Sequence, residues 1–303
     1  MKFAAALLFA CLAFAQKPAA DSPPLTEQEE LSKALGEAGS SGTDLTRALE
    51  HHLQKYPATP QRAAIEKALA QWAIESNDRT RIVLYGERVL KAEPNNELQL
   101  IDHVIRALLS AGDADSAKKA LVYVKRYEAQ IEALRSRAAE GHMSPGQWAE
   151  QVNKNQSRAL VLEARAQGIL GSGEEAVKLA TTAWNTSPGA EQARELARLL
   201  EKLGRREEAV ERYADAFTIE DSTATDAERA ADRQHAGELY KALHTSEKGL
   251  GDVFLSAYDR TRALKRERIA RIKIDDPNFD AVEIVDFTLP RAGGGTSLPL
   301  ASL

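Results

Sequence analysis

Residue types that often carry catalysis or bind metals occur in this 303-residue chain, but their spacing favours structural roles. Cys11 is the only cysteine. His51 and His52 are adjacent, and neighbours on a helix point about 100° apart, so this pair cannot share a metal ion without ligands from elsewhere. We interpret both as part of a solvated helix face. The other four histidines lack the spacing of helical metal motifs: His103, His142, His235 and His244.

Carboxylates and glycines give no catalytic constellation either. The pairs Glu29-Glu30, Glu174-Glu175 and Glu207-Glu208 all fall where a helix is expected to begin, and negative charge there complements the helix dipole. Gly293-Gly294-Gly295 is followed by neither the lysine nor the helix of a phosphate-binding loop. We therefore expect no catalytic residue, no bound metal and no cofactor. The tryptophans lie on apolar helix faces and are expected in the core: Trp72, Trp148 and Trp184.

The first 15 residues have the pattern of a secretory signal peptide. Lys2 precedes an apolar run, and Ala13-Phe14-Ala15 is a cleavage site of the A-x-A kind before Gln16. Cleavage there removes Cys11, and residues 16–25 follow as a linker. The alternative, a lipoprotein with lipid on Cys11, is less favoured because Phe9 is bulky for such a site. We expect an exported protein, periplasmic or secreted, with no membrane span.

The charge pattern argues against a nucleic-acid partner. The formal net charge is −5, from 40 basic and 45 acidic residues, and both signs are interleaved along the chain. A nucleic-acid-binding protein of this size would show a basic stripe or a strongly basic domain.

Two short segments repeat at an offset of 33 residues. Gly171 to Ala176 reads G-S-G-E-E-A, and Gly204 to Ala209 reads G-R-R-E-E-A. In each, a glycine follows one helical pattern, a glutamate pair opens the next, and an alanine lets the two helices approach closely. An offset of about 34 residues is typical of stacked helix hairpins. The sequence therefore predicts an all-α chain that works by presenting a surface.

Aligning the small residue of each second helix extends this register along the chain. The positions are Ile82, Ala117, Ala176 and Ala209, with spacings of 35, 59 and 33 residues. The middle interval holds an insertion, which we expect to form a long antiparallel helical hairpin around 114–170. Repeats should thus cover residues 26–221. Residues 222–274 should form a terminal helical pair that covers the last repeat's apolar face.

These features resemble the tetratricopeptide repeat (TPR). The resemblance implies a right-handed α-solenoid of helix hairpins whose concave groove binds a protein or peptide partner. The chain departs from the family at Leu160 and Ala193, where the family often has tryptophan. The residues that define the repeats by this resemblance lie at turn, small, aromatic and stop positions: Gly112, Ala117, Gly171, Ala176, Pro188, Gly204, Ala209, Tyr213 and Ala216.

Residues 281–303 differ from the rest and predict a short β-hairpin or a disordered tail. Ala281 to Leu289 is rich in β-branched and aromatic residues, Pro290 to Gly295 reads as a turn, and Thr296 to Leu298 is a candidate return strand. The segment from Val285 to Leu303 resembles the opening hairpin of redoxins, the thioredoxin-like thiol-disulfide oxidoreductases. That family's C-x-x-C does not occur in these 303 residues, so we expect no redox activity.

Two functions follow as hypotheses. The first is an exported interaction scaffold without catalytic activity of its own. The second is the helical arm of a truncated, redoxin-fused oxidoreductase. Reading the gene downstream of Leu303 for a W-C-x-x-C frame would separate the two, whereas partner identity and oligomeric state are beyond the sequence.

Overall fold

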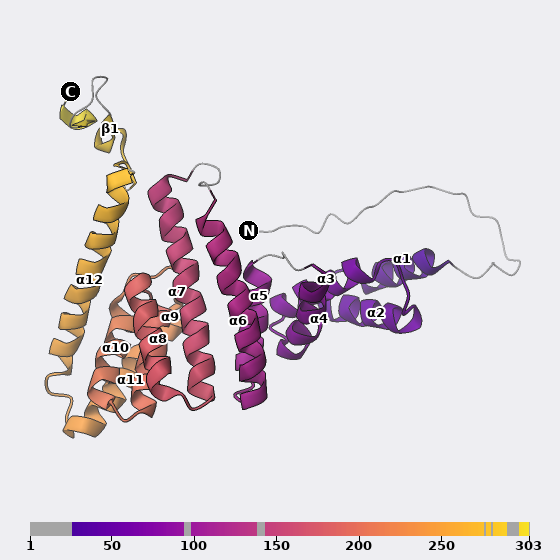
Figure 1. Cartoon of the computed structure of the whole chain (residues 1–303), viewed down its shortest axis with the longest axis horizontal. Coiled ribbons are helices and arrows are strands. Elements are labelled where there is room, and N and C mark those ends of the chain that lie inside the picture. Colours follow the sequence, from indigo (N-terminus) through magenta and orange to yellow (C-terminus); the bar gives the residue numbers. More distant parts are fainter. Residues whose placement is uncertain are drawn as a thin grey trace, which may run out of the picture. The chain divides into compact units, whose positions relative to one another are not determined.

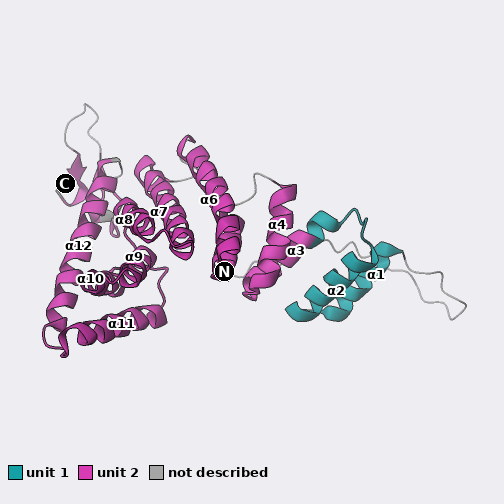
Figure 2. Ribbon diagram, turned by 60° about the horizontal axis from the view of Figure 1, so that its bottom comes forward, with its two compact units in different colours: residues 1–65 teal, residues 66–303 magenta. Residues whose placement is uncertain are grey.

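A computed structural model describes residues 26–93, 98–137, 143–275, 277–279, 281–289 and 297–302 (Figure 1). In these ranges the chain forms twelve α-helices, two 3-10 helices and two short strands. The proposed signal peptide, the linker, Cys11, His142 and Gly293-Gly294-Gly295 lie outside them. Contacts between Cα atoms divide the chain into two units, residues 1–65 and 66–303, with the boundary inside α3, Arg62–Glu75 (Figure 2).

The first unit contains the packed helices α1, Glu27–Ala38, and α2, Gly42–Lys55. The segment Thr26-Glu27-Gln28-Glu29 has the sequence pattern of a capping box, and the structure contains one. The Thr26 side chain accepts a hydrogen bond from the Glu29 amide, and Glu29 accepts one from the Thr26 amide. The sequence pattern predicts a first helix that ends near Leu35, a loop from Gly36 to Gly42 and Thr43 as the next cap, and these bounds are wrong. Helix α1 continues to Ala38, Gly39 ends it with a φ of +58°, and Ser41 rather than Thr43 caps α2.

The second unit is a series of helices in which each packs on the next in the chain. Helix α4 packs on α5, α5 on α6, α6 on α7, α7 on α8, α8 on α9 and α9 on α10. The all-α prediction is therefore confirmed: the second unit is a series of consecutive packed helices, as in an α-solenoid. The bounds are α4 Arg79–Ala92, α5 Leu98–Leu109, α6 Ala114–Arg135, α7 Pro145–Ile169, α8 Gly173–Thr186, α9 Ala190–Lys202 and α10 Arg206–Thr218.

Glycines at three helix ends have the left-handed backbone conformation that reverses the chain. Gly112, Gly171 and Gly204 follow α5, α7 and α9, with φ angles of +73°, +86° and +77°. Residues with a Cβ rarely adopt these angles, which explains why glycine occurs at the same point of each hairpin.

The small residues that follow these turns lie where two helices meet. Ala117, Ala176 and Ala209 are completely buried, each in the first turns of a second helix. Ala216 is also completely buried, Tyr213 is 6% exposed, and Pro188 lies half-buried in the connection between α8 and α9. Close helix contact leaves no room for a larger side chain at the alanine positions.

Two long helices, α6 and α7, occupy the interval of the inserted residues and pack together. Val124, Tyr127 and Ile131 form a buried stripe on α6. Helix α7 begins with Ser144 as its cap, in a capping box with Gln147, and with Pro145 in its first turn. Gly141, whose residue type predicts the C-terminal cap of the long helix α6, lies outside the described residues.

The last two helices, α11 (Asp226–His244) and α12 (Leu250–Asp275), both pack on α10. Helix α12 also reaches α7, which the sequence did not indicate (Figure 1). The contact is close, because a Cβ atom placed on Gly146 of α7 would lie 3.1 Å from the carbonyl oxygen of Ile272. The final helix therefore connects the end of the series to the long hairpin.

The C-terminal segment forms a two-residue antiparallel ladder. Strand β1, Thr288–Leu289, pairs with β2, Leu298–Pro299, between the 3-10 helices η1, Ile284–Asp286, and η2, Leu300–Ser302. The expected short hairpin is confirmed, but the strand predicted from Ala281 shrinks to two residues. Asn278 holds it in place: its side-chain oxygen accepts a hydrogen bond from the Thr288 amide at 2.7 Å.

Within the described residues, the structure contains no helix whose length and apolar character would let it cross a bilayer.

Candidate binding groove

A hollow of about 750 Å³ lies along α5, α7, α9 and α11 and is lined mainly by charged side chains. Its position follows from helical spacing: Glu191, Arg194, Glu195 and Arg198 recur at three- and four-residue intervals on α9, so they share one face. Arg158 and Arg165 lie two turns apart on α7 and meet them there. We call this hollow the groove. Its cations are Arg106, Arg158, Arg165, Arg194, Arg198 and Lys202.

Arg106 of α5 connects two helices, α5 and α9, through its guanidinium group. It donates to Asp102 at 2.8 Å on its own helix, and to both oxygens of Glu191 on α9 at 2.5 and 3.0 Å. Burial by itself would lower the pKa of Arg106, but the hydrogen bonds and the charges of Glu191 and Asp102 outweigh it and raise that pKa. Burial would likewise raise the pKa of Glu191, yet Arg106 brings it below its ordinary value. Both groups are therefore charged at neutral pH.

The other arginines cover carboxylates that lie beneath them. Glu195 is only 3% exposed; it accepts from Arg165 at 3.0 Å and also pairs with Arg198. Asp232 of α11, also 3% exposed, accepts two hydrogen bonds of 2.7 Å from Arg194. Those bonds raise the pKa of Arg194 although burial opposes them. The groove thus presents guanidinium groups to solvent above Glu195 and Asp232, and Glu228, which is 47% exposed, is an acidic residue on its surface.

Arg158 is the exception in this network. Its Nε lies 3.8 Å from Asp102 Oδ1 and 3.9 Å from Glu191 Oε2, beyond hydrogen-bond distance. Among the described residues it has no hydrogen-bond partner, and its side chain is 41% exposed. Asp102 Oδ1 is buried and also lacks a hydrogen-bond partner there. Arg158 therefore keeps its N–H donors available for an acceptor on a ligand.

A second hollow, of about 350 Å³, continues past Arg158 toward the loops that follow α8 and α10. Gln151, Lys154, Asn155 and Arg158 line it from α7, at intervals that place them on one side of the helix. Helix α7 thus offers a row of amide, ammonium and guanidinium donors.

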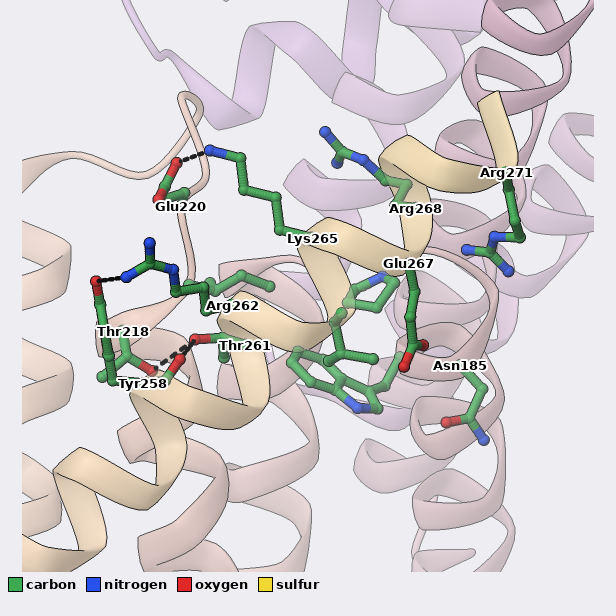
Figure 3. A pocket seen from close by; sticks show the side chains of 14 residues that line it. Asn185, Thr218, Glu220, Tyr258, Thr261, Arg262, Lys265, Glu267, Arg268 and Arg271 are labelled. Carbon is green, nitrogen blue, oxygen red and sulfur yellow. Dashed lines mark hydrogen bonds and ion pairs between the residues drawn. The ribbon is translucent and has the colours of Figure 1, made fainter. Parts of the chain in front are cut away.

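A third, smaller hollow of about 180 Å³ lies beneath α12 (Figure 3). Its apolar wall includes Trp184, which is 7% exposed, and Leu264. The polar side chains carry both signs: Lys265 is paired with Glu220, and Glu267 points to the side opposite Arg268 (Figure 3). The charged residues that line this hollow are four cations, Arg262, Lys265, Arg268 and Arg271, and two glutamates, Glu220 and Glu267.

The residues singled out by the repeat pattern fall in the turns and the core, and only Gly112 also lines the groove. The groove residues themselves were missed. The signal was present in the sequence from Glu191 to Arg198, where glutamates and arginines alternate at helical spacing. The sequence pattern did not show which helices pack against α9, because partners such as Arg106 and Glu191 are 85 residues apart.

The interpretation of His52 as solvated is wrong. His51 is exposed, but His52 is 4% exposed and its Nε2 lies 3.2 Å from Oε1 of Glu27. Helix α1 supplies this partner, which the pattern of α2 alone did not reveal. His103 is half-buried, and burial lowers its pKa. Over the described ranges, no group of three or more histidine, cysteine or acidic side chains is arranged to hold a metal ion.

Comparison with known proteins gives distant structural likenesses only. No protein-family model matches the chain. No curated protein matches it either. A thermophilic TPR protein of Thermus thermophilus, TTC0263, is 19% identical, with 70% of this chain and 98% of that chain covered and a TM-score of 0.38. A tetratricopeptide repeat protein of Parabacteroides merdae is 15% identical, with 81% and 98% covered and a TM-score of 0.35. Because both scores are below 0.5, the architecture described above rests on this chain's own contacts.

Proposed function

We propose that this chain is an interaction scaffold that binds an extended segment of a partner protein in the groove. The observation that carries the proposal is Arg158, whose guanidinium is positioned by neighbouring charges but has no hydrogen-bond partner among the described residues. A peptide offers the acceptors it lacks, as backbone carbonyl oxygens and side-chain carboxylates.

The surrounding network supports this role because it is already formed. Arg106, Arg165 and Arg194 are each hydrogen-bonded to a carboxylate from another helix, so the groove does not have to be ordered when a ligand binds. A preformed site avoids part of the entropy cost of association. Arg158 and Lys202 are not hydrogen-bonded to a carboxylate among the described residues. Since they add positive charge to the groove, we expect a partner segment that carries acidic residues.

The test uses two labelled peptides of equal length, one alternating glutamate and alanine and the other lysine and alanine. We expect the acidic peptide to bind with a measurable change in fluorescence anisotropy, and Arg158→Gln to weaken it about fivefold, as for a partly exposed charged contact. Arg135→Gln on α6 is the control, since that arginine pairs only with Glu132 among the described residues and does not line the groove. Equal binding of both peptides would contradict the proposal.

We further propose that the protein is exported and has no catalytic activity of its own. Support comes from Ala13-Phe14-Ala15 before Gln16 and from Cys11 being the only cysteine. Both thiol-disulfide exchange and peroxide reduction need an attacking thiolate. The intact mass of the exported form should correspond to a chain beginning at Gln16, and an insulin-reduction assay should remain negative. A lipid-bearing mass that retains Cys11 would contradict export as a cleaved protein.

The second candidate, the helical arm of a redoxin-fused oxidoreductase, is favoured by one observation. Thr288 and Leu289 pair antiparallel with Pro299 and Leu298, in the segment whose sequence resembles a redoxin's opening hairpin. A W-C-x-x-C frame directly downstream in the gene would support this candidate. Its absence would leave the interaction scaffold as the proposed function.

A further inference from the structure

We propose that the hollow between α7, α12 and the two loops after α8 and α10 binds a small polyvalent oxyanion of the diphosphate class. This site goes beyond the peptide-binding groove. It shares Arg158 with the groove, whereas its other two cations, Lys154 and Arg268, line the hollow of about 350 Å³ but not the groove.

All three cations have donors to offer. Lys154 is exposed, and among the described residues neither it nor Arg158 has a hydrogen-bond partner. Arg268 lies 3.5 Å from Glu150 Oε1, and its buried Nε makes no hydrogen bond within the described structure. Because that Nε is enclosed beside Glu150, the donors that Arg268 offers to a ligand are its terminal N–H groups, which also make no hydrogen bond within the described residues.

The geometry places the three cations along one side of α7. Glu150, Lys154 and Arg158 follow at four-residue intervals, each step rising about 6 Å along the helix. Arg268 meets this row at Glu150, from α12. Arg268 also lines the smaller hollow beneath α12, although Figure 3 shows its side chain on the opposite side of that helix from Glu267. The row is therefore longer than one phosphate group and suits two linked ones.

The acidic side chains of this hollow are already engaged. Glu191 is held by Arg106, and Glu220 is paired with Lys265. Asp221 accepts from the Ala190 amide at 2.9 Å and from Thr223. Burial alone would raise the pKa of Asp221, but these hydrogen bonds lower it. Arg106 and Lys265 thus compensate two of the three carboxylates of this hollow, and the charge of Arg229 contributes to the low pKa of Asp221. Lys154 and Arg158 are not hydrogen-bonded to any of the three.

The capping pattern argues against a purely structural role for these cations. The carbonyl groups at the end of α10 are bound by Arg229, which donates to Phe217, Ile219 and Asp221. The Ser157 hydroxyl lies 2.8 Å from the carbonyl oxygen of Ala183 and 3.1 Å from that of Ser187 at the end of α8. Neither helix end therefore needs Lys154 or Arg268 as a cap.

Size and lining also fit. A volume of about 350 Å³ lies at the lower end of the range for small-molecule sites, about 300 to 1,000 Å³, so a compact anion fills it. Ser222 and Thr223 add hydroxyl groups, and Asn155 adds an amide, around the three cations. Phosphate oxygens accept several such bonds at once.

The experiment titrates the full chain with pyrophosphate by calorimetry at constant ionic strength, with citrate and sulfate as comparison anions. We expect saturable pyrophosphate binding that is stronger than binding of either comparison anion. Lys154→Gln and Arg268→Gln should each weaken it roughly tenfold, as expected for loss of a charge-assisted hydrogen bond. Glutamine at 268 can still donate to Glu150, so the contact with α7 is retained.

Arg266→Gln is the matched control, because Arg266 lies on the same helix, is exposed and does not line the hollow. It should leave the affinity unchanged, and circular dichroism should report the same helix content for all three variants. Absence of saturable pyrophosphate binding would overturn the proposal. Tighter binding of citrate than of pyrophosphate would overturn the assignment to a phosphate ligand. An equal loss of pyrophosphate affinity in Arg266→Gln would overturn the assignment of the site to this hollow.

Discussion

Arg106 of α5 holds Glu191 of α9 through two hydrogen bonds, although α7 lies between these helices in the chain and contacts both. One ion pair therefore connects helices from hairpins that are not consecutive. Helix solenoids are held chiefly by contacts between neighbours, so a direct connection of this kind adds coupling along the series.

The first prediction concerns the strength of that connection. Glu191→Gln should lower the free energy of unfolding by about 1 to 2 kcal/mol, because Arg106 loses its charged acceptor while both side chains keep partial access to solvent. Urea denaturation measures the change. Glu132→Gln is the control, since Glu132 is 70% exposed and pairs only with Arg135 among the described residues. Equal effects of the two variants would show that the connection adds no stability.

The second prediction is that the difference in free energy of unfolding between wild type and Glu191→Gln depends on pH. The pKa of Glu191 is lower in the folded protein than in the unfolded chain. Its contribution is therefore fully present above the ordinary glutamate pKa of about 4.3 and is lost as the pH falls through the lower folded value. The stability gap between wild type and Glu191→Gln should be constant near neutral pH and narrow in acid. A gap that widens in acid would contradict the assignment.

The third prediction tests the repeat register. Ala176→Leu and Ala209→Leu should each destabilise the protein by about 1 to 3 kcal/mol, because both alanines are completely buried where helices meet. Thermal melts provide the measurement. Glu175→Gln, at an exposed position next to Ala176, should be nearly silent. If the leucine variants melt like wild type, the register is wrong.

The fourth prediction concerns the contact between α12 and α7. Gly146→Val should loosen the end of α12, because its Cβ would meet the Ile272 backbone oxygen at 3.1 Å, and backbone cannot move as a side chain does. Limited proteolysis should then cut α12 faster. Gly36→Val in α1 is the matched control, with no atom within 4 Å of the added Cβ. Equal protease resistance of both variants would remove Gly146 as a packing constraint.

These cases also show what the sequence could predict. Gly171, Gly204 and Ala176 act within a single hairpin, and the Thr26 cap acts within a single turn, so local patterns located them. The groove could not be found in the same way, because the partners of Arg106 and Arg194 lie 85 and 38 residues away and only the stacking of helices brings them together. The contact of α12 with α7 could not be predicted either, because these helices are also far apart in the sequence. The interpretation of His52 as solvated was wrong for the same reason, since its partner Glu27 comes from α1.

The last prediction is that deleting Ile284 to Leu303 leaves the helical body as stable as before. The ladder in this segment has only two residue pairs, Thr288 with Pro299 and Leu289 with Leu298, and isolated two-stranded ladders are marginal in water. Val285, Phe287 and Leu289 are 55%, 40% and 46% exposed, so they bury little apolar surface. Circular dichroism melts of the full and shortened chains should therefore agree. A large loss of melting temperature on deletion would show that the segment docks on the helices, and it would favour a self-contained scaffold over the arm of a larger oxidoreductase.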